Sequence, residues 1–488
     1  MKTVPKIRVQ RINDAPVVKK GAYVLYWMIA FRRPGWNFSL DRAIEWAGEL
    51  KKPLVVLEAL RSGYPWASDR LHRFIIQGMA ENARAFEDSP VLYHPYVESR
   101  RDAGKGLLQG LAQRACVVVA DDFPGFFLPR MVAAACRRVP VCMEKVDSNG
   151  ILPLGAADRV FTTAYSFRRF LQKTLPSHLG SFPRAQPLRN LNIPSLKALP
   201  KEISERWPRA SASLLQGDPQ GLESLPIDHR VFGVQDTGGF SEAKRLLRIF
   251  LEKKLSVYPQ ERNHPDADGT SSLSPYLHFG HISSHEVFQK VLQQEEWDPG
   301  RISGKATGGR SGWWGMGEGA EAFLDQLITW RELGFNMSRL QEDYDQYGSL
   351  PGWALETLRA HEADPRACLY SLDVFEGAKT HDALWNASQS QLLEEGRIHN
   401  YLRMLWGKKI LEWTKNAEEA LYVMIELNNK YALDGRDPNS YSGIFWVLGR
   451  YDRAWGPERR IFGKVRFMSS KNTARKVRLR DYLQRYAP

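Results

Sequence analysis

The segment NYLRMLWGKKILEW reads as a helix with four apolar residues on one stripe, namely Leu402, Trp406, Ile410 and Trp413. A buried face that packs in the core accounts for such a stripe. An indole is also polar at one edge and easily oxidised, so several indoles in line can relay electrons where leucine would pack more simply. Trp385, in the preceding helical run, extends this set of candidates.

The next segment, NNKYALDGRDPNSYSGIFW, breaks the helical pattern with two aspartates, a glycine and a proline. Asp434 and Asp437 can cap and turn the chain before the following helix. Carboxylates and amides at a helix junction can also hydrogen-bond a polar heterocycle, and Asn428 offers a neutral donor or acceptor to a ring nitrogen. The sequence is compatible with both roles.

A third polar group lies in DGTSSLSPYLHFGHIS. Its hydroxyls and backbone N–H groups, at a turn that leads into a helix, suit a phosphate or pyrophosphate. The hydroxyls belong to Thr270, Ser271, Ser272 and Ser274. A helix N-cap needs only one of them, so the segment is a candidate phosphate site.

The charge balance favours a polyanionic partner. Lys+Arg 68 against Asp+Glu 55 gives +13, with a pI near 9.4, which favours nucleic acid over an acidic small substrate. The four cysteines form no CxxC pair, which argues against zinc and disulfides and fits a reducing cytoplasm. No signal peptide and no apolar stretch of about 18 residues occurs, so we expect a soluble protein without membrane or metal.

These candidate residues need a scaffold, and 488 residues suggest two domains. Up to about residue 144, β-rich runs such as AYVLYWMIA and CVVVADD alternate with helical segments, the rhythm of a Rossmann-like parallel sheet. We predict an α/β domain over 1–175, a linker over 176–235 and an all-helical domain over 236–488. No GxGxxG follows the first strand, so a ligand of the α/β domain would be held in another way. Residues 301–319 form a basic, glycine-rich loop.

The motifs GTSSLSPYLHFGHIS, THDALWNASQ, HNYLRMLWGKKILEW and LDGRDPNSYSGIFW, in this order, resemble the helical FAD-binding domain of the photolyase/cryptochrome superfamily. The class II cyclobutane pyrimidine dimer photolyases are the most similar group. The resemblance covers the whole chain, with the α/β half as the antenna-type domain, and is strongest over 274–468. It implies a U-shaped FAD in the helical domain, active as the reduced anion.

The resemblance also assigns roles around the flavin. Trp406, Trp385 and Trp413 match the class II tryptophan relay, and Asn428 matches the asparagine that faces flavin N5. The full set implied for FAD binding is Tyr258, Thr270, Ser271, Ser272, Leu273, Ser274, Arg331, Asn400, Arg403, Asn428, Asp434 and Asp437.

On the DNA side, the resemblance implies a pyrimidine dimer flipped out of the duplex, with Trp330 and Trp446 sandwiching it and Met404 beneath. From the residues alone, Trp330 reads as a core aromatic, Met404 as gap filling and the basic C-terminal run as a solvated face. Asp452, Arg453 and Trp455 match the segment that fills the gap in the duplex, and Arg466 matches a phosphate contact. YDRAW lies one residue closer to Trp446 than is usual in class II.

Two positions depart from the family pattern. Gln326 stands where most class II members have glutamate, so it can donate an N–H to the dimer but cannot supply a proton. On an α-helix the neighbouring Asp325 points about 100° away and is a poor substitute. Phe335 stands where aspartate is common.

The leading hypothesis is therefore a lyase that uses light and reduced FAD to repair UV-induced cyclobutane dimers in DNA. The main rival is a cryptochrome-like flavin photoreceptor with weak or no repair activity. A flavin- or nucleic-acid-binding protein without photochemistry is a more distant one. The expected state is a monomer. The sequence leaves open a second antenna chromophore, deazaflavin or folate, and the choice between cyclobutane dimers and other photoproducts.

Overall fold

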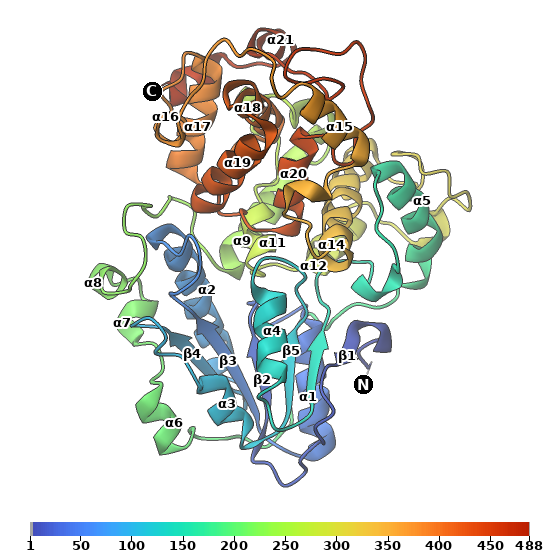
Figure 1. Ribbon diagram of the computed structural model, residues 1–488. Helices are drawn as coiled ribbons and strands as arrows, with labels where there is room; N and C mark the ends of the chain where they lie inside the picture. The colour runs from blue at the N-terminus through green and yellow to red at the C-terminus, as the bar shows by residue number, and fades with distance from the viewer. Residues whose placement is uncertain (1–2, 488) are drawn as a thin grey trace. The chain divides into compact units, whose positions relative to one another are not determined.

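The structure is a computed structural model that describes residues 3–487 (Figure 1). It divides into two compact units, each assembled from separate stretches of the chain. Unit 1 consists of Met1–Ala157, Thr174–Arg248 and Leu273–Gln294, and unit 2 consists of Asp158–Lys173, Ile249–Ser272 and Glu295–Pro488. Residues 176–235, predicted as a linker, belong to unit 1 in this division.

Unit 1 contains a six-stranded sheet in the order β1-β6-β5-β2-β3-β4. The strands are β1 (Val9–Arg11), β2 (Tyr23–Met28), β3 (Leu54–Leu60), β4 (Leu92–Val97), β5 (Ala115–Asp121) and β6 (Met143–Val146). All neighbours pair in parallel except the edge strand β1, which is antiparallel to β6. The predicted parallel sheet is confirmed. Its central strands read as unbroken apolar runs because both faces are covered.

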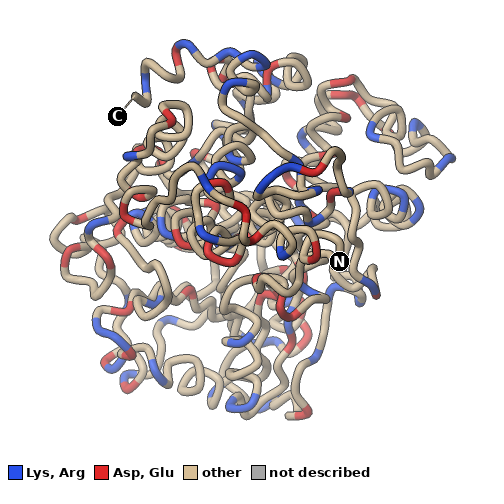
Figure 2. Tube along the Cα trace, turned by 45° about the horizontal axis from the view of Figure 1, so that its top comes forward, with Lys and Arg blue, Asp and Glu red and all other residues tan. Residues whose placement is uncertain are grey.

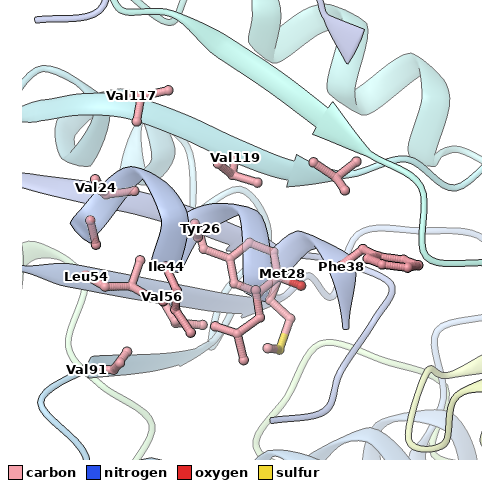
Figure 3. Close-up of a cluster of buried hydrophobic side chains, with 14 of the residues drawn as sticks. Val24, Tyr26, Met28, Phe38, Ile44, Leu54, Val56, Val91, Val117 and Val119 are labelled. Atoms are coloured by element: carbon pink, nitrogen blue, oxygen red, sulfur yellow. The ribbon is translucent and has the colours of Figure 1, made fainter. Parts of the chain in front are cut away.

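Four helices connect the parallel strands: α1 (Phe38–Leu50), α2 (Asp69–Glu87), α3 (Leu107–Ala112) and α4 (Leu128–Cys136). Right-handed crossovers place α1 and α2 on one face of the sheet and α3 and α4 on the other. α1 begins where the Asn37 side chain accepts two backbone N–H groups. Phe38 and Ile44 of α1 then pack against Tyr26 and Met28 of β2 in the core cluster of Figure 3.

The carboxyl ends of β2 and β5 lie side by side where the strand order reverses, the usual ligand position in open α/β sheets. Asp121, the last residue of β5, fills this position. One of its carboxylate oxygens accepts the N–H groups of Ile29, Ala30 and Phe31 at 2.9, 2.8 and 2.9 Å. The other accepts the Tyr26 hydroxyl at 2.8 Å. Three successive N–H groups aimed at one oxygen make an anion-binding nest, and it is occupied by the protein's own side chain.

The connector after α5 (Ala164–Thr174) has little regular structure beyond the short helices α6 (Lys201–Arg206), α7 (Ala212–Leu215) and α8 (Pro219–Glu223). Its isolated leucines nevertheless have a clear role. Leu188 and Leu191 pack against the core cluster, and Arg184 forms an ion pair with Asp41 of α1 at 2.8 Å. The connector is thus fastened to unit 1.

Unit 2 is built of helices, as the sequence predicted. Those that carry the candidate site are α13 (Glu318–Leu324), the π-helical segment Asp325–Trp330, α14 (Arg331–Leu340), α17 (Ala383–Glu395), α18 (Asn400–Trp413), α19 (Ala417–Tyr431) and α20 (Pro438–Val447). Figure 1 shows α17 to α20 gathered as neighbours in orange and red.

Among the described residues, no helix is both long and apolar enough to cross a bilayer.

Candidate functional site

Three tryptophans of unit 2 form a continuous line of rings. The ring centroids of Trp406 and Trp385 are 6.5 Å apart with planes 4° from parallel, and those of Trp385 and Trp413 are 6.0 Å apart at 71°. Trp406 and Trp413 lie about 10 Å apart along α18, and Trp385 of α17 closes the gap between them. All three side chains are at most 2% exposed. Core packing and ring-to-ring contact therefore coexist.

Hydrogen bonds fix two of these rings. Trp385 Nε1 donates to the backbone carbonyl of Trp406 at 3.0 Å, which ties α17 to α18. Trp406 Nε1 donates to Gln389 Oε1 at 2.9 Å, and Gln389 is fully buried. Buried indoles with satisfied N–H groups are held in one orientation, which a relay between rings requires.

Trp413, at the far end of the line, is covered by two further rings. Its centroid lies 5.6 Å from that of Tyr370 and 5.0 Å from that of His381, which is exposed. The Lys409 ammonium lies 5.1 Å from the Trp413 ring centre. Trp413 is therefore close to the surface without being exposed itself.

Trp330 and Trp446 stack directly on one another, with centroids 4.6 Å apart and planes 15° from parallel. The helices that carry them cross at Gly334 of α14, where a Cβ atom would lie 2.8 Å from Ser442 Oγ of α20. Trp330 lies one turn before Gly334 and Trp446 one turn after Ser442, so this close crossing brings the rings together. Trp446 Nε1 is buried and has no hydrogen-bond partner within residues 3–487.

Gln326 lies with Trp330 in the π-helical segment, not in a regular α-helix as the sequence suggested. Such π segments often occur at functional sites. Asp325 forms a two-pronged ion pair with Arg168, whose Nε and Nη2 donate to its two carboxylate oxygens at 2.8 and 3.1 Å. Asp325 is therefore not available to a ligand, whereas the neighbouring Gln326 is half-buried.

Phe335 is 1% exposed and lies beneath Arg331, whose guanidinium is 4.3 Å from the ring centre. Phe335 thus contacts Arg331 through a cation–π interaction.

α18 and α20 also approach closely, because a Cβ atom on Gly407 would lie 2.6 Å from Val447 Cγ2. Beside it, Lys408 is 1% exposed and its Nζ donates to the carbonyl of Val447, the last residue of α20. Burial lowers the pKa of Lys408 to about 7, against the opposing charge of Asp452. This contact fastens the end of α20, next to Trp446, to the helix that carries Met404.

Polar atoms without partners gather where α18 begins. Arg403 Nη2 pairs with Asp434 Oδ1 at 3.2 Å, while the buried Arg403 Nε has no partner in the described part of the chain. The same holds for both ring nitrogens of His399. Burial, together with the charge of Arg397, lowers the pKa of His399 to about 4. Because buried polar atoms are normally hydrogen-bonded, this cluster fits a polar ligand.

Asn428 and Asp437 lie on neighbouring helices. Asn428 is 1% exposed, and its Nδ2 donates to Ser440 Oγ of α20 at 3.0 Å. Asp437 caps α20 by accepting the Asn439 N–H at 2.9 Å, so the capping role considered for it is present. Asn400 begins α18 but is exposed, and the structure does not bring it into the buried cluster.

The predicted phosphate segment straddles the division of the chain. Thr270, Ser271 and Ser272 belong to unit 2, whereas Leu273 and Ser274 belong to unit 1. Ser272 Oγ accepts Nη1 of Arg397 at 3.1 Å. Leu273 occupies the N-cap position of α11 (Ser274–His278), so a hydroxyl does not serve as its cap. Tyr258, the remaining predicted contact, is buried in unit 2 at the start of α10 (Tyr258–Glu261).

Three of the four residues predicted for DNA binding surround the ring of the fourth, Trp455. Asp452 Oδ1 accepts Trp455 Nε1 at 3.0 Å, and the guanidinium groups of Arg453 and Arg466 lie 4.8 and 5.0 Å from the Trp455 ring centre. Both arginines are exposed. The result is a cationic and aromatic surface that follows Trp446 in the chain.

Sequence reasoning missed three residues of this site: His399, Gln389 and Lys408. His399 is the N-cap residue of α18 but makes no side-chain cap hydrogen bond, and nothing in the sequence around it marked it. The signal for Lys408 is the lysine pair inside WGKKILEW, since a charge within a helix buried on most sides must find a partner. No group of three or more metal-ligating side chains is found within residues 3–487.

No family model matches the chain. A deoxyribodipyrimidine photo-lyase of Methanothermobacter thermautotrophicus is 35% identical over 479 residues, covering 98% of this chain and 97% of that protein. One of Arabidopsis thaliana is 30% identical over 485 residues, covering 96% and 91%. Among solved structures, a bacterial class III photolyase from Agrobacterium tumefaciens aligns with a TM-score of 0.66 and 16% identity, covering 96% and 86%. At that identity the structural match concerns the fold alone.

Proposed function

Because the chain belongs to the photolyase/cryptochrome superfamily, we propose that it is a deoxyribodipyrimidine photo-lyase that repairs UV-damaged DNA in light. The observation that carries the proposal is the buried line from Trp406 through Trp385 to Trp413, with its rings in contact. Oxidisable rings in contact suit electron transfer, and core packing alone does not require tryptophan at three successive contacts.

FAD is the proposed cofactor. Arg403, Asn428 and Asp434 in unit 2, together with the unpartnered ring nitrogens of His399, would hold it. When bound and reduced, FAD supplies an electron donor that light can excite. The surrounding helices exclude water, and the buried indoles lead from the site toward Tyr370 at the surface.

The proposed substrate is a cyclobutane pyrimidine dimer turned out of the duplex. Trp330 and Trp446 already touch, so a flat base can lie between them only if the rings separate by about 3.5 Å, one van der Waals layer. Gln326 then donates an N–H to a dimer carbonyl, and Met404 packs beneath. Arg453 and Trp455 fill the space left in the duplex, while Arg466 contacts phosphate.

We place the chain in class II because of the order of its motifs and the relay built from α17 and α18. We also propose that it is a cytoplasmic monomer. One observation favours the rival, a cryptochrome-like photoreceptor: Gln326 offers no proton to the reacting dimer. Loss of that proton donor would lower the repair yield without affecting the indole relay.

A second chromophore, a deazaflavin or a folate, is proposed for unit 1. A cavity of about 230 Å³ there is lined by Trp36 and Phe240 with Arg33, Lys244 and Glu286. This volume is below the roughly 300–1,000 Å³ typical of whole-ligand pockets, so it suits a single ring system. Lys244 lies 3.7 Å from Glu286, which leaves Arg33 and Arg189 as the other cations of the lining. Two aromatic walls and these arginines fit a carbonyl-rich heterocycle.

The deciding experiment is to illuminate the FAD-loaded, reduced protein with dimer-containing DNA and to measure restored thymines against a dark control. A gain in the light alone supports the enzyme. Flavin photoreduction without restored thymines would instead support the photoreceptor.

A further inference from the structure

The predicted glycine-rich loop is fastened to α5. Gln172 Oε1 accepts the Gly308 N–H at 2.7 Å, and Gln172 Nε2 donates to the carbonyl of Gly309 at 3.1 Å. Gly308 has a φ of +78° and lies against Tyr165, whose ring Cε2 would be 2.9 Å from an added Cβ. Only glycine fits here. Helix and loop therefore present one continuous surface.

Five exposed side chains project from this helix and loop, and we call them the α5–loop surface: Tyr165, Arg169, Lys173, Lys305 and Arg310. The first three are spaced four residues apart and so share one face of α5. Tyr165 is 59% exposed, unusual for so large a ring. No aspartate or glutamate occurs from residue 159 to 174 or from 301 to 317. Figure 2 shows lysine and arginine along the coil that is α5 in Figure 1.

α5 is anchored to the helices that carry the proposed dimer pocket. Arg168 pairs with Asp325, the neighbour of Gln326. Asn336 of α14 donates to the Arg159 carbonyl at 3.0 Å and accepts the Phe161 N–H at 3.0 Å. The buried side of α5 is thus held by charge and hydrogen bonds. The cations on its outer side, Arg169 and Lys173, are exposed and can contact a binding partner.

Helix dimensions set the reach of this surface. The Arg168–Asp325 ion pair joins α5 to the π-helical segment. Two helix radii of about 5 Å each, plus about 5 Å for outward side chains, put Arg169 and Lys173 about 15 Å from the axis that carries Gln326. One strand of duplex DNA advances 3.4 Å per base pair, so about 15 Å corresponds to four or five base pairs.

We propose that the α5–loop surface binds the sugar–phosphate backbone of the same duplex, about four or five base pairs from the lesion. This inference rests on the proposed function. Four exposed cations, on stretches of chain that contain no aspartate or glutamate, suit phosphates, and the exposed Tyr165 ring suits a sugar face. The surface would set the length of duplex that the protein needs for tight binding.

The test compares duplexes of about 8 and about 20 base pairs, each with one central thymine dimer, since only the longer reaches the α5–loop surface. The variant Arg169→Gln, Lys173→Gln, Lys305→Gln, Arg310→Gln should lose about tenfold or more in affinity for the long duplex. Its slope of log K against log salt should fall by about 1 to 3, at 0.9 per lost phosphate contact. Tyr165→Ala should weaken binding without changing that slope.

The matched control is Lys19→Gln, Lys20→Gln, Lys51→Gln, Arg130→Gln, which removes the same charge from exposed positions of unit 1. It should keep the wild-type preference for the long duplex. Equal effects of the two quadruple variants, or a wild-type protein that binds both lengths equally, would overturn the inference. If the wild type does not prefer damaged to undamaged DNA at either length, the proposed function itself fails. If the wild-type protein binds single-stranded RNA more tightly than the long duplex, and this binding is lost in the α5–loop variant, the inference about the α5–loop surface is also overturned.

Discussion

The indole of Trp330 lies face to face with that of Trp446, 4.6 Å between ring centres, because Gly334 lets α14 and α20 cross without an intervening side chain. The two rings thereby shield one another from water while no base is present. A base that enters replaces one ring–ring contact by two ring–base contacts. The free energy needed to separate the two indoles is therefore offset when the base binds.

Trp446→Ala should therefore weaken binding of damaged DNA. One lost stacking contact is worth about 1–3 kcal/mol, or about 5- to 150-fold in Kd. Titration of a dimer-containing duplex measures it, with flavin absorbance as the control. Trp446→Phe should keep part of the affinity. Loss of flavin from the alanine variant would show that Trp446 is structural.

Trp385→Phe should slow photoreduction of bound, oxidised FAD, as should Trp406→Phe, because Trp385 is the link between Trp406 and Trp413. Transient absorption after a blue flash is the measurement. Trp27→Phe, a buried tryptophan on β2 of unit 1, serves as the control. Unchanged kinetics in the Trp385 variant would remove the relay assignment.

Gln326→Glu should raise the number of dimers repaired per absorbed photon, because a carboxyl group can supply the proton that an amide cannot. The yield is measured under limiting light with saturating DNA. Asp325→Asn is the matched control. It should lower the melting temperature by breaking the pair with Arg168, whose side chain is 7% exposed, and should not raise the yield. A fall in yield in the Gln326→Glu variant would contradict the proposed role.

Lys408→Met should change how stability depends on pH. The pKa of Lys408 is about 7 in the folded protein against 10.5 for a free lysine. Between these values the unfolded chain holds a proton that the native protein lacks, so wild-type stability rises with pH, by up to about 1.4 kcal/mol per unit. The methionine variant lacks this rise.

Urea unfolding at pH 7, 8, 9 and 10 tests this expectation. The free energy of unfolding of the wild type, relative to Lys408→Met, should grow by a few kcal/mol across the series. Lys19→Met, at an exposed position, should show no such trend. A constant difference between wild type and Lys408→Met would mean that Lys408 remains charged, held by the carbonyl of Val447.

The sequence predicted those features that depend on local periodicity. The strands of unit 1 read as apolar runs, and the stripe on α18 put Trp406 and Trp413 on one face of the helix. Contacts set by a single atom left no such pattern. The stacking of Trp330 on Trp446 depends on the absence of a Cβ atom at Gly334, and the sequence of neither helix predicts this stacking.

Other features were hidden for different reasons. β1 is three residues long at a sheet edge, too short for a periodic signal. The connector reads as aperiodic because Leu188 and Leu191 anchor it singly. The π-helical turn at Gln326 keeps the composition of an α-helix, so only backbone geometry reveals it.

Asp121 has a consequence for the ligands that unit 1 can bind. With its carboxylate on the amides of Ile29, Ala30 and Phe31, the crevice where related architectures grip a nucleotide's phosphates is plugged from within. A nucleotide phosphate could enter this crevice only by displacing the Asp121 carboxylate, so a ligand that docks here would have to be bound through other groups.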